Sequence, residues 1–172
     1  MLQRIPEQFL VWSAEKGRQV FSEHGQNRSY IQRNRVMTNV QIATAFAFSM
    51  LGVPYIYGGQ SRAGTDCSGL VQQILDQVGL DPKNDQNAQA LFNILKTKQI
   101  EKPCEGRIVF FGSKITRIHH VGYCISEDRM IEAAHGTSLC TTVEYSKKIG
   151  AQVEINLITR LSDRIAVVNP FA

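Results

Sequence analysis

The sequence has no paired cysteines, few prolines and no internal repeat, and each shortage excludes a class of protein. Its 172 residues include four cysteines, none of them in a Cys-x-x-Cys pair. A chain of this length does not need a disulfide framework to fold, so we expect free thiols. With five prolines and no repeat, collagen-like and mucin-like chains are excluded. Charged residues at 20% and hydrophobic residues at 43% exclude a disordered tail and fit one globular domain.

No run of the sequence is long and apolar enough to predict a transmembrane helix. The longest uncharged stretch, residues 36–61, is interrupted at Gly52 and Pro54, short of the roughly 20 apolar residues that a span requires. It predicts a buried helix followed by a loop. Pro6 and Glu7 interrupt the amino-terminal residues where a secretory signal would be continuously apolar. We therefore expect no membrane insertion, and any action outside the cytoplasm would need a route other than a cleaved signal.

Positive charge is in modest excess, with 19 lysines and arginines against 15 acidic residues and a net charge of +4. This excess favours an anionic partner such as a cell-wall polymer, a membrane surface or nucleic acid, without selecting one of them. Nucleic acid is not expected, because Arg28, Arg33 and Arg35 have one aromatic neighbour, Tyr30, and no known reader motif. A metal site is not expected either, because no pair of histidines or cysteines has the spacing of zinc ligands.

Apolar periodicity predicts helices in the first half of the chain and strands in the second. It predicts helices at residues 42–51, 65–79 and 86–95. Short apolar or alternating runs predict strands at residues 108–111, 120–125, 130–134, 139–143, 153–158 and 165–168. Helices followed by strands indicate an α+β domain with a mainly antiparallel sheet. We place this domain at residues 41–172, after an N-terminal extension of unknown role at residues 1–40.

Cys67 differs from an ordinary packing cysteine by its surroundings. It falls in the first turn of a predicted helix, where unpaired backbone N–H groups and the helix dipole favour the thiolate. Its neighbours Asp66, Ser68 and Gly69 are polar or small, and a histidine pair lies downstream on a strand. These features indicate a nucleophile. The other cysteines are expected to be small core or edge residues: Cys104, Cys124 and Cys140.

The histidine pair lies on a predicted strand, and the alternation of the strand separates its two members. His120 shares a face with Gly122 and Cys124, whereas His119 faces the other way. Only one of the two histidines can therefore meet Cys67. Another residue on the same face must then hold its imidazole ring.

Two hairpin registers provide different partners for His120. A three-residue loop at residues 126–128 makes Glu132 a diagonal neighbour of His120 on the same face. A two-residue turn at residues 127–128 places His135 directly across from His120 instead. Either partner would accept the Nδ1 proton and leave Nε2 facing the thiol, as in a catalytic triad.

Four blocks of sequence follow one another between residues 42 and 134. They are Gly52-Val53-Pro54-Tyr55-Ile56-Tyr57-Gly58-Gly59, Asp66-Cys67-Ser68-Gly69-Leu70-Val71, Val109-Phe110-Phe111, and His120-Val121-Gly122-Tyr123 with Met130-Ile131-Glu132-Ala133. Together they resemble the NlpC-type cell-wall cysteine peptidases, and the resemblance implies a papain-like core. In one place the sequence departs from the family pattern, because Pro103-Cys104-Glu105-Gly106-Arg107 stands where the family usually has Pro-Gly-Asp. The start of the following strand is expected to differ accordingly.

The resemblance implies catalytic roles for three residues. Cys67 would be the nucleophile and His120 the general base. The family's third residue, more often a histidine, lies twelve positions after the base, which selects Glu132 over His135. Such enzymes hydrolyse the bond between γ-D-glutamate and diaminopimelate, or lysine, in peptidoglycan stem peptides through an acyl-enzyme.

The resemblance also implies how substrate is bound. The hydroxyl of Tyr55 would lie near the oxyanion or the substrate, and Asp66 and Ser68 would lie around the substrate's amino end. Neither a metal nor an organic cofactor would be needed. The expected partners are stem peptides of bacterial peptidoglycan, with a virion or secretion-apparatus contact through residues 1–40 as a further hypothesis. We accordingly expect synthesis in the cytoplasm and delivery to the cell wall by a phage particle, lysis or a secretion system.

Two other functions fit the same sequence. A related thiol amidase, transferase or deamidase toxin would use the same residues on a different amide bond. A catalytically silent assembly module would share the fold, but all three residues of the implied triad are present, and loss of activity usually removes one of them.

Overall fold

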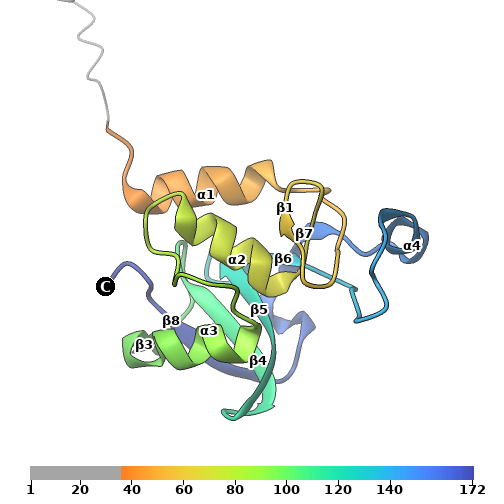
Figure 1. Cartoon of the computed structure of the whole chain (residues 1–172). Helices are drawn as coiled ribbons and strands as arrows, with labels where there is room; N and C mark the ends of the chain where they lie inside the picture. The colour runs from red at the N-terminus through yellow and green to blue at the C-terminus, as the bar shows by residue number, and fades with distance from the viewer. Residues whose placement is uncertain (1–35) are drawn as a thin grey trace, which may run out of the picture. The chain divides into compact units, whose positions relative to one another are not determined.

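The computed structural model describes residues 36–172 as a six-stranded antiparallel sheet with helices packed against it (Figure 1). The strand order is β3-β8-β4-β5-β6-β7, which confirms the expected α+β class. The strands are β3 (Gln99–Ile100), β4 (Ile108–Lys114), β5 (Arg117–Cys124), β6 (Arg129–Ala133), β7 (Val153–Leu157) and β8 (Arg164–Val168). Most of the predicted N-terminal extension, residues 1–35, lies outside the described residues.

Four α-helices and two short 3-10 helices complete the described part of the chain. They are α1 (Asn39–Ser49), α2 (Cys67–Asp76), α3 (Ala88–Leu95), α4 (Val143–Ile149), η1 (Lys96–Lys98) and η2 (Ile158–Arg160). A two-stranded hairpin of β1 (Gln60–Ser61) and β2 (Gly64–Thr65) precedes α2. Within residues 36–172, no helix combines the length and the apolar character that crossing a bilayer demands.

The helix that carries Cys67 forms where the periodicity predicts it. α2 begins at Cys67 because Asp66, as N-cap, accepts a hydrogen bond from the Gly69 amide at 2.7 Å. Its apolar face packs against the sheet, and Figure 1 shows the helix lying across β5. The residues of this face are fully buried: Leu70, Val71, Ile74 and Leu75.

The sheet is buried on both of its faces. On the side of α2 and α3, Phe110 of β4 and Phe92 of α3 pack edge to face, with ring centroids 5.3 Å apart. On the other side, Ile158 of η2 packs with a second buried cluster, which includes Val109, Phe111, Cys124, Met130 and Val167. Burial on both faces explains why β4 is a continuous apolar run in the sequence rather than an alternating one.

The hairpin between β5 and β6 decides between the two predicted registers. Tyr123 pairs with Ile131, which is the register of a three-residue loop at residues 126–128. The alternative two-residue turn is therefore wrong. His135 lies beyond the end of β6, in a left-handed backbone conformation with φ of 58°.

One predicted strand, residues 139–143, is wrong, because the chain there leads into α4. The Thr142 side chain caps this helix by accepting a hydrogen bond from the Tyr145 amide at 3.3 Å. Gly150 ends it with φ of 72°, a left-handed conformation that glycine adopts without strain. These polar capping signals outweigh the apolar residues that suggested a strand.

The first predicted helix is present, but it is buried along one side rather than all round. α1 begins at Asn39, earlier than predicted, because Thr38 and Gln41 form a reciprocal capping box. Ala43 and Ala47 are fully buried, whereas Phe48 is 44% exposed.

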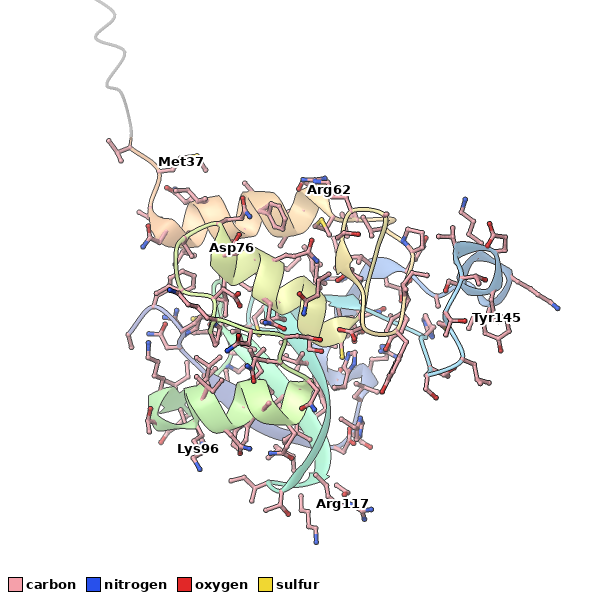
Figure 2. The ribbon with its side chains drawn as sticks, viewed as in Figure 1. Met37, Arg62, Asp76, Lys96, Arg117 and Tyr145 are labelled. Atoms are coloured by element: carbon pink, nitrogen blue, oxygen red, sulfur yellow. The ribbon has the colours of Figure 1, made fainter. Side chains whose placement is uncertain are left out.

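Arg62 attaches the β1–β2 hairpin to the end of α1 (Figure 2). Its guanidinium donates hydrogen bonds to the Ser49 carbonyl at 3.1 Å and to the Ser49 hydroxyl at 2.7 Å. The same group lies 5.3 Å from the centroid of the Phe46 ring. These contacts hold the loop that leads into Cys67 against the rest of the domain.

Phe110→Ala is expected to destabilise the domain by about 3–5 kcal/mol, because it removes a buried ring and leaves a cavity beside Phe92. Urea unfolding followed by circular dichroism measures the change. The control Ile115→Ala removes a side chain of a residue that is 54% exposed and should change the free energy of unfolding by less than about 0.5 kcal/mol. Equal losses in the two variants would contradict this account of the core.

Candidate active site

Cys67 is the first residue of α2, beside helix amides that have no intrahelical partner. The dipole of the helix favours negative charge at this end. The Asp66 carboxylate organises the turn: Oδ1 accepts hydrogen bonds from the Ser68 hydroxyl at 2.9 Å and the Gly69 amide at 2.7 Å. Its Oδ2 accepts a third from the Gly58 amide at 2.9 Å. Asp66 thereby fixes the backbone on both sides of the thiol.

His120 on β5, which is partly buried, pairs with the buried Glu132 on β6. Nε2 of the imidazole contacts Oε2 of the carboxylate, and Glu132 is fully buried. Cys67 and His120 line the same hollow, and Nδ1 is the ring nitrogen that remains for the thiol. The expectation that Nδ1 faces the acid and Nε2 the thiol is wrong, because the nitrogen farther from the backbone is the one that reaches across to β6.

The charges around His120 favour its protonated form. Burial alone would lower the pKa of this imidazole, but hydrogen bonds and charge interactions with Cys67 and Glu132 raise it well above its ordinary value. Burial would raise the pKa of the Glu132 carboxyl, but its contact with His120 and hydrogen bonds from Arg160 and Asn156 lower it. Both groups are therefore charged near neutral pH.

Two residues that the sequence analysis missed complete the surroundings of Glu132. Arg160, the last residue of η2, donates hydrogen bonds to Oε1 from Nε at 3.0 Å and from Nη2 at 2.8 Å. Asn156 on β7 donates to the same oxygen from Nδ2 at 2.8 Å. The available signal was the alternation of β7, which places the polar residues Glu154 and Asn156 on one face. Nothing in the local pattern marks Arg160.

Tyr55 lies next to the thiol with its hydroxyl protonated. Burial, with the nearby charges of Cys67 and Asp66, raises the pKa of Tyr55 well above its ordinary value. The ring packs against Gly136, where a Cβ would come within 2.2 Å of ring atoms. The loop after β6 therefore needs glycine at this position to leave room for the Tyr55 ring.

Two hollows of different character meet at Cys67. The larger, of about 460 Å³, is lined by acidic and hydroxyl groups that include Asp66, Asp85, Tyr57 and Ser68. The smaller, of about 210 Å³, is lined by side chains that can carry positive charge: His119, His120, His135 and Arg160. Tyr55 and Cys67 border both, so the thiol lies where an extended ligand would pass from one hollow to the other.

The remaining two histidines of the described part lie at the surface, each with its own carboxylate. His119 contacts Asp163 through Nε2 at 2.8 Å, and His135 contacts Glu154 through Nε2 at 3.0 Å. His135 is thus paired with Glu154 on β7, while Glu132 holds His120. Among residues 36–172, no three histidine, cysteine, aspartate or glutamate side chains are grouped as metal ligands.

A comparison with models of protein families identifies the family to which this chain belongs. The model of the NlpC/P60 family matches residues 52–154, a range that includes Tyr55, Cys67, His120 and Glu132. The chain belongs to the NlpC/P60 family. The family expected from the sequence blocks is therefore confirmed.

Named relatives of this NlpC/P60 domain include two peptidases. A probable endopeptidase of Haemophilus influenzae is 35% identical over 85 residues, which cover 48% of this chain and 52% of that protein. A gamma-D-glutamyl-L-lysine dipeptidyl-peptidase of Bacillus subtilis is 30% identical over 111 residues, which cover 63% of this chain and 32% of that protein. The chain spans about half or less of the length of these relatives.

A solved structure confirms the papain-like fold of this NlpC/P60 domain. The peptidoglycan hydrolase RipB of Mycobacterium tuberculosis superimposes with a TM-score of 0.60 and 22% sequence identity, over 78% of this chain and 65% of that one. It shares the helices packed on a mainly antiparallel sheet. At this level of identity the likeness establishes the fold alone.

Iodoacetamide at neutral pH is expected to alkylate Cys67 before Cys124 and Cys140. Cys67 borders both hollows, whereas the other two are fully buried, and burial raises the pKa of Cys124 to about 12. Peptide mapping by mass spectrometry after partial labelling measures the order, with Cys67→Ala as the control. Labelling of Cys124 as fast as Cys67 in the native protein would contradict this description of the site.

Proposed function

We propose that this domain hydrolyses the bond between γ-D-glutamate and diaminopimelate, or lysine, in the stem peptides of bacterial peptidoglycan. One observation carries the proposal: Cys67, at a helix N-terminus, lines the same hollow as His120, which is paired with the buried Glu132. Membership in the NlpC/P60 family and the name of the Bacillus subtilis relative support this choice of bond.

In the first step, the Cys67 sulfur attacks the γ-carbonyl carbon of D-glutamate, and His120 holds the proton that has left the thiol. The carbonyl oxygen becomes an oxyanion. The Cys67 amide, which has no partner within the helix, and the protonated hydroxyl of Tyr55 are the donors that stabilise it. Donors fixed before the reaction stabilise this charge without reorganisation.

In the second step, the carbon–nitrogen bond breaks and a thioester remains on Cys67. The proton passes from His120, on the Nδ1 side that faces the sulfur, to the leaving amine. Neutral His120 then accepts a proton from the water that attacks the thioester. Release of the thiolate restores the starting pair, and Glu132 stabilises the positive charge of His120 in each protonated state.

The two hollows fit the two ends of a stem peptide. Asp66 and Asp85 make the larger hollow favourable for an amino group on the acyl side, with the Ser68 hydroxyl nearby. His119 lines the smaller hollow and can form a hydrogen bond with a carboxylate of the leaving diaminopimelate side. The scissile bond would then lie over Cys67.

Mass spectrometry of defined muropeptides tests the proposed bond. The substrates are L-Ala-γ-D-Glu-diaminopimelate, its lysine analogue and intact sacculi, each incubated with wild-type protein and with Cys67→Ala. We expect cleavage after γ-D-glutamate by the wild type and none by the variant. Cleavage of free peptides together with resistance of sacculi would restrict the substrate to released stem peptides.

Two further variants test the roles around His120. Glu132→Ala should lower kcat by roughly 100-fold or more, because it removes the group that holds the imidazole. His135→Ala is the matched control and should cost far less, since its partner is Glu154. A larger loss of kcat in His135→Ala than in Glu132→Ala would contradict the proposed triad.

No cleavage of any of the muropeptides by protein with reduced Cys67 would contradict the proposed peptidase activity. That result would favour another amide substrate or an assembly module.

A further inference from the structure

The carboxylate of Glu132 has a separate set of partners on each oxygen. Oε2 contacts His120, and Oε1 accepts three hydrogen bonds, two from Arg160 and one from Asn156, at 2.8–3.0 Å. Because Glu132 is fully buried, an oxygen that lost these donors would have no water to replace them. The donors on Oε1 therefore determine which oxygen faces the imidazole.

We propose that Arg160 is a positioning residue for the reaction, which keeps Glu132 ionised and oriented so that Oε2 supports the protonated His120. The inference rests on the proposed function, in which Cys67 and His120 carry out the chemistry. Arg160 influences the reaction through Glu132. Its planar guanidinium is suited to this role because Nε and Nη2 donate side by side.

The register of the sheet makes a positive charge necessary at this position. β6 and β7 pair Glu132 directly opposite Glu154, and like charges in such a pair destabilise each other. Asn156 bridges the two carboxylates at 2.8 and 2.7 Å, but it is neutral and cannot offset their charge. Glu154 has His135 as its own partner at 3.0 Å. Arg160 supplies Glu132 with a cation that stays charged at every working pH.

The charge balance of the site gives the direction of the effect. Glu132 has two cationic partners, His120 and Arg160, and one acidic neighbour, Glu154. Without Arg160, the buried Glu132 facing Glu154 would take up a proton at a higher pH. A neutral Glu132 no longer stabilises the imidazolium, so the thiolate–imidazolium pair would form only at higher pH.

The alkylation rate of Cys67 by iodoacetamide, measured from about pH 4 to pH 9, reports on this pair without any peptide substrate. We expect Arg160→Met to shift the acid limb of the profile upward by about one pH unit or more. Arg160→Lys should restore part of the shift, because it keeps the charge but loses the paired donors. Arg129→Met, at an exposed position of β6, is the matched control and should leave the profile unchanged.

Steady-state kinetics on muropeptides should show a fall in kcat of about tenfold for Arg160→Met, with little change in KM. In a Glu132→Gln background the same substitution should have little further effect, because the charge on which it acts is gone. If the double variant instead lost kcat by the product of the two single-variant factors, the proposal would be overturned. A raised KM with an unchanged pH profile would also overturn it and would assign Arg160 to substrate binding.

Folding and function can be separated in these tests. Thermal unfolding identifies variants that do not fold. If Arg160→Met does not fold, the alkylation profile of Arg160→Lys tests the proposal instead. We expect its acid limb to shift upward by less than about one pH unit, and an unchanged acid limb would overturn the proposal. A wild-type Cys67 that reacts no faster in acid than a free cysteine would overturn both proposals. A reactive Cys67 that cleaves no muropeptide would contradict the proposed substrate alone, because the alkylation profiles still test Arg160.

Discussion

A fully buried carboxylate stays ionised only when donors or cations occupy both of its oxygens, and the site depends on how Glu132 meets this requirement. One oxygen holds His120 and the other is occupied by Arg160 and Asn156. The negative charge that these partners maintain favours a protonated imidazole, and this imidazole lines the same hollow as Cys67. The charge of the imidazole near Cys67 is thus set by a carboxylate on β6.

The fold brings these groups together with short connections. β5, β6 and β7 are consecutive neighbours in the antiparallel sheet, so His120, Glu132 and Asn156 come from adjacent strands. Arg160 follows on the 3-10 turn directly after β7. α2 packs across β5 and directs its N-terminus toward the same end of the sheet, which supplies Cys67 with backbone donors (Figure 1).

Local patterns predicted the elements and residues that depend on neighbours close in sequence. The helical period and the capping residues of α2 predicted where Cys67 lies. The local pattern left two hairpin registers open, and the structure has the one with a three-residue loop, which brings Glu132 near His120. The nitrogen that faces Glu132 was predicted wrongly, because ring orientation depends on side-chain reach rather than on register. Arg160 was missed because it lies 28 residues after Glu132 in the sequence, beyond α4 and β7, and no local pattern records such a contact.

The protonation state of His120 in the resting protein tests the account most directly. Nitrogen-15 chemical shifts of labelled histidine, recorded from about pH 6 to pH 8 and assigned with a His120→Gln variant, distinguish a neutral ring from an imidazolium. The account predicts that His120 carries protons on both nitrogens throughout this range and loses that state in Glu132→Gln. A ring that titrates with a midpoint of about 6.5, as an unperturbed histidine does, would contradict it.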